Sequence, residues 1–358
     1  MKSNPSYWGG PIEWLSSQEI KNKYVSRGTY SITQKAIDEK TTKLIGSSIP
    51  LIVSRSGILA RRVPISITTK SMAINQDIKA LAFNRKLFTL DYFFAQLQSN
   101  EKFILKSIVK TGTTVQSISM PDFNKIMLTI PNLDEQGRIG RFFNATDKII
   151  ELHQRKIQIL QRIKRLYLQE MLANTEQHHP NLRFNIFEDN WKTYKLKEVI
   201  VNEFKGKANA NMSGTESIYL DTNYLNGGEV SFVDSSSNIA EDDVIILWDG
   251  SQAGTVYHGF RGALGSTLKA FTPRYSGSFI YLQLLKNQNR IYHNYRTPNI
   301  PHVIKTFSED FLIPMASQNE QNKISTFLNK LEYDIKLQKE ELDTLVKIKE
   351  EYLNKMFI

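Results

Sequence analysis

The sequence predicts an α+β fold in which two mixed α/β domains are joined by two long helices that form an intramolecular antiparallel coiled coil. The sequence of residues 135–172 is repeated at residues 320–357, with a constant offset of 185, and 13 of the 38 aligned positions are identical. Both copies have the apolar spacing of a coiled coil. The segments before the two copies also share one order of expected strands, turns and helices. These three observations predict a pseudo-two-fold repeat.

The repeated segment alternates steps of four and three residues, which places apolar side chains along one seam. Each helix would be about 60 Å long at ~1.5 Å per residue, so it needs a partner along its length. In an antiparallel pair within the chain, the numbers of facing residues sum to 495. A parallel homodimer of each helix is the alternative. The expected seam consists of Ile139, Phe143, Ile150, Ile157, Leu160, Tyr167 and Met171, and of Ile324, Leu328, Leu331, Ile335, Leu342, Leu345, Tyr352 and Met356.

The composition is that of a folded protein with two domains, because 358 residues are too many for one ordinary core and 41% of them are hydrophobic. The chain has no cysteine, which excludes disulfides, thiolate zinc sites and cysteine nucleophiles. No apolar run approaches the roughly 18 residues of a membrane span, and the N-terminus has no signal-peptide pattern. We therefore expect a cytoplasmic protein without a membrane partner.

The net charge of +10 is unevenly distributed along the chain. Residues 1–130 carry 18 basic and 8 acidic side chains, whereas residues 178–312 carry 13 and 14. A basic domain favours a polyanionic partner, of which nucleic acid is the commonest.

The repeat and a break at His178-His179-Pro180 divide the chain into five parts. We predict a first domain over residues 1–130, a long helix over 131–173, a linker over 174–190, a second domain over 191–312 and a second long helix over 313–358. The paired histidines are expected to be solvated.

The first domain is expected to be mixed α and β. Ser31, with Gln34 three residues later, has the pattern of a capping box that begins a helix. In chain order we expect a strand near 12–15, a helix over 32–44, strands at 50–54, 63–68 and 72–83, a helix over 89–108, a polar loop over 110–117 and a strand over 126–130.

The second domain is expected to repeat this order. Strands at 244–248 and 266–271 flank the turn Asp249-Gly250-Ser251, a helix covers about 278–290, and a polar loop covers 296–302.

The sequence lacks the common catalytic motifs, including a phosphate-binding loop, a dinucleotide-binding glycine pattern and a His-Glu-x-x-His zinc motif. Asn4-Pro5-Ser6-Tyr7 is similar to the amino-group pocket of adenine methyltransferases, but no strand precedes it and no glycine-rich cofactor loop exists. Asp221, Asp242 and Asp243 have no further carboxylate at a spacing suited to a metal. We expect no catalytic residue, no metal site and no enzyme activity.

Several motifs resemble the specificity subunit of Type I restriction-modification systems. Ile130-Pro131 with Glu135-Gln136, and Ile313-Pro314 with Glu320-Gln321, stand at the start of the two helices. The resemblance extends to Leu182-Arg183-Phe184, Trp191 and Lys195-Leu196, to Tyr7-Trp8-Gly9-Gly10 and Trp14, and to Asp249-Gly250-Ser251. Asn185-Ile186 departs from the Pro-Gly that the family often has. Nothing before Tyr7 matches Trp191 to Leu196, so the first domain is expected to lack its opening strand.

This resemblance implies two target recognition domains, each reading half of a bipartite DNA site. It also implies that the helices dock two methyltransferase subunits and, through them, restriction subunits. The chain itself would need no cofactor, since S-adenosylmethionine would bind the methyltransferases. A coiled-coil adaptor without DNA specificity, or a free-standing adenine methyltransferase, are the alternatives.

Candidate DNA-binding residues follow from the chemistry of DNA, because Lys and Arg contact phosphates whereas Arg, Asn, Gln, Ser and Thr read base edges. In the first domain the candidates are Arg55, Arg61, Arg62, Thr113 and Gln116, and in the second they are Lys205, Lys207, Asn209, Asn211, Arg261, Arg296 and Asn299.

Overall fold

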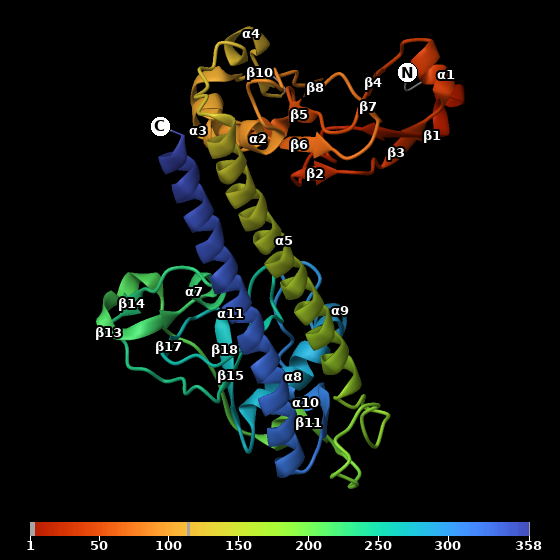
Figure 1. Ribbon diagram of the computed structural model, residues 1–358. Coiled ribbons are helices and arrows are strands. Elements are labelled where there is room, and N and C mark those ends of the chain that lie inside the picture. The colour runs from red at the N-terminus through yellow and green to blue at the C-terminus, as the bar shows by residue number, and fades with distance from the viewer. Residues whose placement is uncertain (1–3, 113–114, 358) are drawn as a thin grey trace. The chain divides into compact units, whose positions relative to one another are not determined.

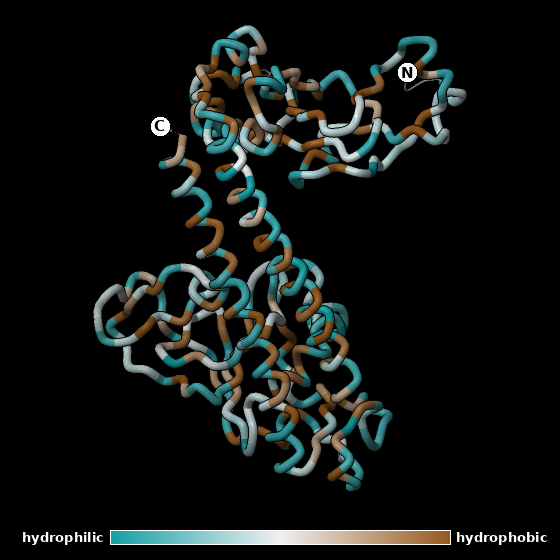
Figure 2. Tube along the Cα trace, in the orientation of Figure 1, coloured by the Kyte–Doolittle hydropathy of each residue, from teal (hydrophilic) through white to brown (hydrophobic). Residues whose placement is uncertain are grey.

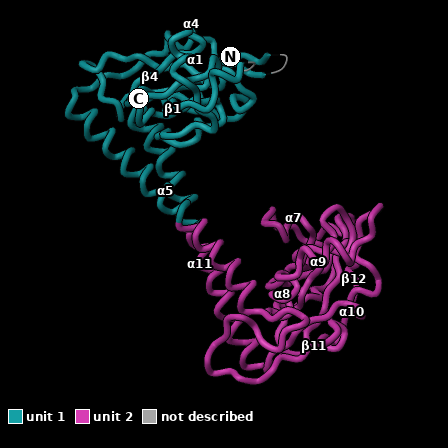
Figure 3. Tube along the Cα trace, turned by 90° about the vertical axis from the view of Figure 1, so that its right-hand side faces the viewer, with its two compact units in different colours: residues 1–155, 339–358 teal, residues 156–338 magenta. Residues whose placement is uncertain are grey.

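A computed structural model describes residues 4–112 and 115–357 (Figure 1). The chain divides into two compact units (Figure 3). Unit 1 contains residues 1–155 and 339–358, and unit 2 contains residues 156–338. The two long helices are α5 (Leu133–Glu170) and α11 (Gln318–Met356). The first part of α5 and the last part of α11 belong to unit 1, and the rest of both helices belongs to unit 2.

Unit 1 is built on two four-stranded sheets, with strand orders β3-β1-β7-β4 and β2-β6-β5-β8. Its largest apolar cluster joins β5 and the helix α2 to the start of α5 and the end of α11. Before α5 the elements are η1 (Pro5–Tyr7), β1 (Trp8–Leu15), β2 (Tyr24–Val25), β3 (Tyr30–Ile32), α1 (Gln34–Asp38), β4 (Lys43–Ile45), β5 (Pro50–Val53), η2 (Gly57–Ala60), β6 (Ile65–Thr68), β7 (Met72–Ile74), β8 (Ile78–Ala80), α2 (Leu90–Ser99), α3 (Glu101–Phe103), the π-helical turn η3 (Ile104–Ile108), β9 (Val109–Lys110), β10 (Ser117–Ile118) and α4 (Met120–Phe123).

Unit 2 is built on a four-stranded sheet β12-β18-β15-β16, a three-stranded sheet β14-β13-β17 and the pair β11-β19. The helix α8 packs on the first sheet and shares a core with Trp191, β15 and the start of α11. The elements are β11 (Lys192–Lys195), α6 (Leu196–Val199), β12 (Ile200–Lys205), η4 (Ala210–Met212), β13 (Ser213–Leu220), α7 (Thr222–Leu225), β14 (Phe232–Val233), β15 (Val244–Leu247), β16 (Val256–His258), β17 (Ala263–Leu264), β18 (Leu268–Pro273), α8 (Gly277–Lys286), α9 (Gln288–Asn294), α10 (Phe307–Asp310) and β19 (Leu312–Met315).

The long helices run antiparallel within each unit, as predicted, with apolar residues recurring along both (Figures 1 and 2). In unit 1, Lys349 Nζ lies 2.6 Å from Asp147 Oδ1, and the Phe142 and Tyr352 rings are 5.1 Å apart. In unit 2, Lys164 pairs with Glu332, and the Tyr167 and Phe327 rings are 5.0 Å apart. The residue numbers of these pairs sum to between 494 and 496, against the expected 495.

The expected seam positions differ in burial. Tyr352 and Met356 are exposed, because at this end of α11 the next residues along, Leu353 and Phe357, pack into the core of unit 1. The other positions are buried (Ile139, Phe143, Ile157, Met171, Ile324, Leu328, Ile335) or half-buried (Ile150, Leu160, Tyr167, Leu331, Leu342, Leu345).

Two expected elements of unit 1 are shorter than their sequence pattern suggests. The helix over 32–44 is only α1, which begins after Thr33 instead of Ser31, because Lys43–Ile45 pairs with β7 as a strand. The strand over 72–83 breaks into β7 and β8 at an Asx turn, where the Asp77 amide donates to Asn75 Oδ1 at 3.1 Å.

Three further expectations need correction. The expected helix over 89–108 divides into α2, α3 and the π-helical turn η3. The expected strand over 126–130 is irregular, because no described segment of unit 1 pairs with it. In unit 2, the expected helix over 278–290 divides into α8 and α9, separated by Asn287.

Candidate nucleic-acid interface

In unit 1 the buried strand β5 is followed by a turn at the surface. Ser54 ends the buried run, and Arg55 follows it as an exposed residue. Arg55 forms an antiparallel bridge with Ser117, and the Ser56 amide donates to the Gln116 carbonyl at 3.0 Å. Two loops that lie some 60 residues apart in sequence therefore meet at one place.

The structure brings four of the first domain's candidates together on these two loops. Arg55, Arg61 and Arg62 are exposed around the short helix η2, and Gln116 is half-buried on the facing loop. Thr113 lies outside the described residues. Three exposed arginines therefore lie on one short surface segment around η2.

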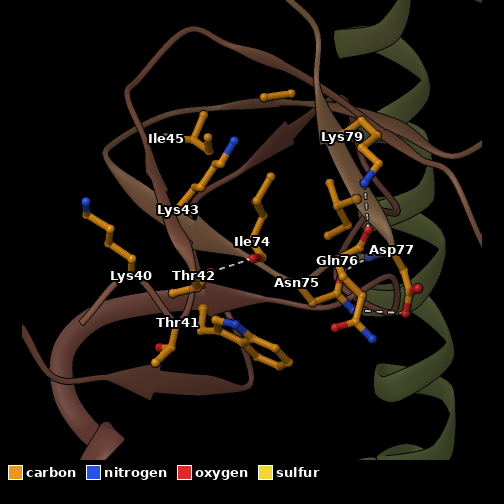
Figure 4. A pocket seen from close by; sticks show the side chains of 13 residues that line it. Lys40, Thr41, Thr42, Lys43, Ile45, Ile74, Asn75, Gln76, Asp77 and Lys79 are labelled. Atoms are coloured by element: carbon orange, nitrogen blue, oxygen red, sulfur yellow. Dashed lines mark hydrogen bonds between the residues drawn. The ribbon is translucent and has the colours of Figure 1, made fainter. Parts of the chain in front are cut away.

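A pocket of about 790 Å³ lies between β4 and the β7–β8 turn (Figure 4). Its lining includes the exposed side chains of Lys40, Lys43 and Lys79. Asp77, also in the lining, accepts a hydrogen bond of 2.7 Å at its carbonyl from the Ser54 amide, so the pocket adjoins the Arg55 turn.

Sequence reasoning missed these lysines. The run from Lys40 to Lys43 is visible in the sequence, but only strand pairing places Lys79 on the same pocket. The lining also includes Thr41, Thr42 and Asn75, and its three lysines outnumber its one carboxylate, Asp77, so the pocket carries a net positive charge.

Unit 2 repeats this construction. The buried strand β15 is followed by the turn Asp249-Gly250-Ser251, and Gly250 has φ +120, a conformation that favours glycine. Asp249 forms an antiparallel bridge with His302, and the Gly250 amide donates to the Pro301 carbonyl at 2.9 Å. His302 follows Ser117 by 185 residues, the offset of the helical repeat. The two facing loops are therefore equivalent.

Two candidates of the second domain are held on this turn. Lys205 Nζ lies 2.6 Å from Asp249 Oδ2. Arg296 Nη2 donates to the Ser251 carbonyl at 2.9 Å, and the guanidinium lies 5.2 Å from the centre of the Tyr292 ring. Asn299 is exposed on the same loop as Arg296. The turn thus holds Lys205 and Arg296 in place, and the exposed side chain of Asn299 lies on the same loop as Arg296.

The remaining candidates lie elsewhere in unit 2. Lys207 and Asn211 are exposed on the segment that follows β12. Asn209 caps η4, where its side-chain oxygen accepts from the Asn211 amide at 3.0 Å, so that oxygen is already engaged. Arg261 is exposed between β16 and β17, and no described contact joins it to the Asp249 turn.

Other kinds of site lack support within the described ranges. Residues 4–112 and 115–357 contain no group of three or more His, Asp or Glu side chains placed to hold a metal ion. None of the helices in these ranges is both long and apolar enough to cross a membrane.

Comparison with known proteins identifies the family. The model of the Type I restriction modification DNA specificity domain matches residues 1–162 and 188–347. The chain belongs to this family. The specificity subunit of the Type I restriction enzyme EcoR124I/EcoR124II of Escherichia coli is 30% identical over 166 residues, which are 45% of this chain and 41% of that relative. The MjaVIII specificity subunit of Methanocaldococcus jannaschii is 28% identical over 180 residues, 47% of this chain and 42% of that relative. The matches thus span about two fifths of each relative.

Solved structures from Type I restriction-modification systems share the fold. The S subunit from M. genitalium has a TM-score of 0.67 at 18% identity, with 99% of this chain and 94% of that chain covered. A chain from a study of complex assembly and conformational transition of the type I R-M system has a TM-score of 0.56 at 14% identity, with 99% and 92% covered. At these identities the likeness concerns the fold, which agrees with the predicted pair of mixed α/β domains and long helices.

Proposed function

We propose that the chain is the DNA-reading specificity subunit of a Type I restriction-modification complex, and that each unit reads one half of a bipartite site. The observation that carries the proposal is the repeated pair of loops. The bridges Arg55–Ser117 and Asp249–His302 occupy equivalent places, each after a buried strand. Exposed Arg61 and Arg62 follow the first, and exposed Lys205 and half-buried Arg296 contact the turn of the second. Paired readers of this kind suit a split target, because each reaches its own group of bases.

The two units would bind DNA with different chemistry. Unit 1 presents Arg55, Arg61 and Arg62 beside a lysine-lined pocket, which favours strong phosphate contacts and bidentate contacts to guanine. Unit 2 presents Arg296 and Asn299, and its turn carries an aspartate already neutralised by Lys205. Base-edge contacts would therefore contribute a larger share of binding in unit 2.

We also infer that the long helices dock methyltransferase subunits, which would carry S-adenosylmethionine and hold the restriction subunits. Apolar side chains remain exposed on the helices of both units. Phe142, Ile149 and Leu152 in unit 1, and Ile159 and Leu166 in unit 2, are each 38–55% exposed. Several exposed apolar side chains on one helix are typical of a protein-binding surface. Leu168 and Leu172 do not belong to this face, because they are buried in the core of unit 2.

Methylome sequencing of cells with and without the gene tests the proposal. A specificity subunit produces one split motif, methylated on both strands, that disappears with the gene. A free-standing adenine methyltransferase would bind S-adenosylmethionine in calorimetry of the purified chain. An adaptor would bind scrambled duplexes as tightly as the motif. Loss of the gene without loss of any methylated motif contradicts the proposal.

A further inference from the structure

The polar loop of unit 2 is a short hairpin that is anchored at its base. Arg296 forms an antiparallel bridge with Val303, which is buried in the core of the unit. One step further along, the Thr297 amide donates to the His302 carbonyl at 3.0 Å. The Gly250 amide, in the turn after β15, donates to another carbonyl of the same loop at 2.9 Å. The hairpin therefore presents its tip from a fixed backbone.

Ile300 stands at the tip of this hairpin, and its backbone is held in one conformation. Its carbonyl accepts from the Thr297 hydroxyl and lies 3.0 Å from His302 Nδ1. Pro301 follows it, and a residue before proline is restricted to extended conformations. The β-branched side chain itself has few rotamers. Ile300 thus loses little conformational entropy when it binds a partner.

Ile300 is an apolar residue at a place where turns usually carry Gly, Pro, Asn, Asp or Ser. It is 79% exposed and belongs to no apolar cluster of the described residues. The equivalent loop of unit 1 carries Val115 at the offset of 185, and this side chain is half-buried. Both loops therefore include a β-branched apolar residue although they are otherwise rich in polar ones. We expect the partner of the loop in unit 2 to offer an apolar group.

DNA offers one apolar group on the base edges of its major groove, the C5-methyl group of thymine. The adenine of the same pair presents an acceptor, N7, and a donor, the N6 amino group, and one Asn side chain can bond both. Asn299, directly before Ile300, is exposed at the same tip. The tip therefore combines an amide that suits adenine with an apolar side chain that suits thymine.

We propose that Ile300 is a specificity-determining residue that packs on the methyl group of a thymine, and that with Asn299 it makes an A·T pair part of the half-site read by unit 2. The inference rests on the proposed DNA-reading function and names one kind of base pair that this function selects. Apolar side chains also enter DNA as wedges between base pairs from the minor groove. Asn299 favours the major groove, because adenine N6 and N7 lie there.

Uracil provides the sharpest probe, since it differs from thymine only by lacking the C5-methyl group. Duplexes of the motif found by methylome sequencing, each with uracil in place of one thymine, are titrated against the full chain and followed by anisotropy. Uracil at one thymine of one half-site should weaken binding about four-fold, the factor that removing one methyl-sized apolar group from water provides. Ile300→Ala should weaken binding of the thymine duplex at least as much, and uracil at that position should then have no further effect.

Ile186→Ala is the matched control, because Ile186 is also an exposed isoleucine of unit 2, at 68%, and lies outside the hairpin. This variant should leave the affinity and the effect of uracil unchanged. Because Ile300 is exposed, Ile300→Ala should keep the thermal midpoint of the unchanged chain.

The assignment is overturned if no thymine responds to uracil, or if uracil weakens binding by the Ile300→Ala chain as much as by the unchanged chain. Loss of affinity in Ile300→Ala without any response to uracil indicates a wedge and also overturns it. In each of these cases the unchanged chain still prefers the motif, so the DNA-reading function stands. A chain without that preference contradicts the proposed function, and this assignment with it.

Discussion

Glu135 and Glu320 occupy the same position in the repeat but differ in burial and bonding. Glu320 has no exposed surface and accepts three hydrogen bonds from Arg183 and Trp191, whereas Glu135 is exposed and lacks a described ion pair. The difference comes from residues outside the repeat, since Arg183 and Trp191 bond Glu320 and no described residue forms the same contacts with Glu135. The same residue type at equivalent positions of the repeat therefore has a different energetic role according to what packs on it.

The two loop pairs show a second difference. The bridge after β5 begins with Arg55, and the equivalent bridge after β15 begins with Asp249, which Lys205 pairs at 2.6 Å. The backbone arrangement is the same while the charge at its centre is reversed. A common scaffold can thus present two different sets of contacts, which is what reading two unlike half-sites requires.

The largest expected effect is the loss of the buried carboxylate in unit 2. Glu320→Ala leaves Arg183 without its partner, so the free energy of unfolding should fall by about 3–5 kcal/mol. Glu135→Ala, the matched change in unit 1, should alter it by less than about 0.5 kcal/mol. Urea denaturation of both variants measures the contrast. Equal effects of the two variants would contradict the difference in burial.

The next effect concerns DNA. Replacing Arg55 and Arg62 with Ala should relax the readout of one half-site, and replacing Arg296 and Asn299 should relax the other. Each base-reading contact is expected to contribute about 1–3 kcal/mol. Affinity measured against duplexes mutated in one half-site at a time separates the two. Lys102→Ala and Arg274→Ala, at exposed positions outside both pairs of loops, serve as controls. If both double variants relax the same bases, the assignment of one half-site to each unit is wrong.

A smaller effect is expected from the lysine-lined pocket of unit 1. Replacing Lys40, Lys43 and Lys79 with Ala should weaken binding to all duplexes alike, because interactions with phosphates carry no sequence information. The slope of log affinity against log salt should become shallower by about 0.9 for each DNA phosphate that the variant no longer neutralises. Filter binding at several salt concentrations checks this. A change confined to one sequence would indicate that the pocket binds bases.

The smallest effect is a difference in acid sensitivity. Burial lowers the pKa of His258, against the opposing influence of Asp242 at 3.5 Å, and the ring stacks on Tyr281. The native ring therefore stays neutral while the unfolded ring, with a pKa near 6.5, takes up a proton. Unit 2 should lose stability as the pH falls below about 6.5. His258→Gln should reduce this loss, measured as the thermal midpoint at several pH values.

The sequence was sufficient for the features that depend on regular spacing. An offset of 185 located both long helices, and the numbers of pairs such as Asp147 and Lys349 sum to within one of the expected 495. Strand pairing was harder, since Lys43–Ile45 continues a helical pattern in sequence and becomes a strand only because β7 pairs with it. The basic pocket was missed for the same reason, because no local pattern connects Lys79 with Lys40. The equivalence of the polar loops that carry Gln116 and Arg296, in contrast, followed from the repeated order of elements.

The ion pairs of the coiled coil have a consequence for how such a chain can arise. The ion pairs Lys349–Asp147 and Lys164–Glu332 are equivalent in the repeat. Asp147 corresponds to Glu332, and Lys164 corresponds to Lys349, each at the offset of 185. The lysine of each helix therefore pairs with the acidic residue of the other helix. This reciprocal pairing is that of an isologous interface. A chain of half this length would carry both partners of the pair and would meet them in a second molecule of itself. Gene duplication and fusion would turn such a homodimer into one chain whose two readers are free to diverge.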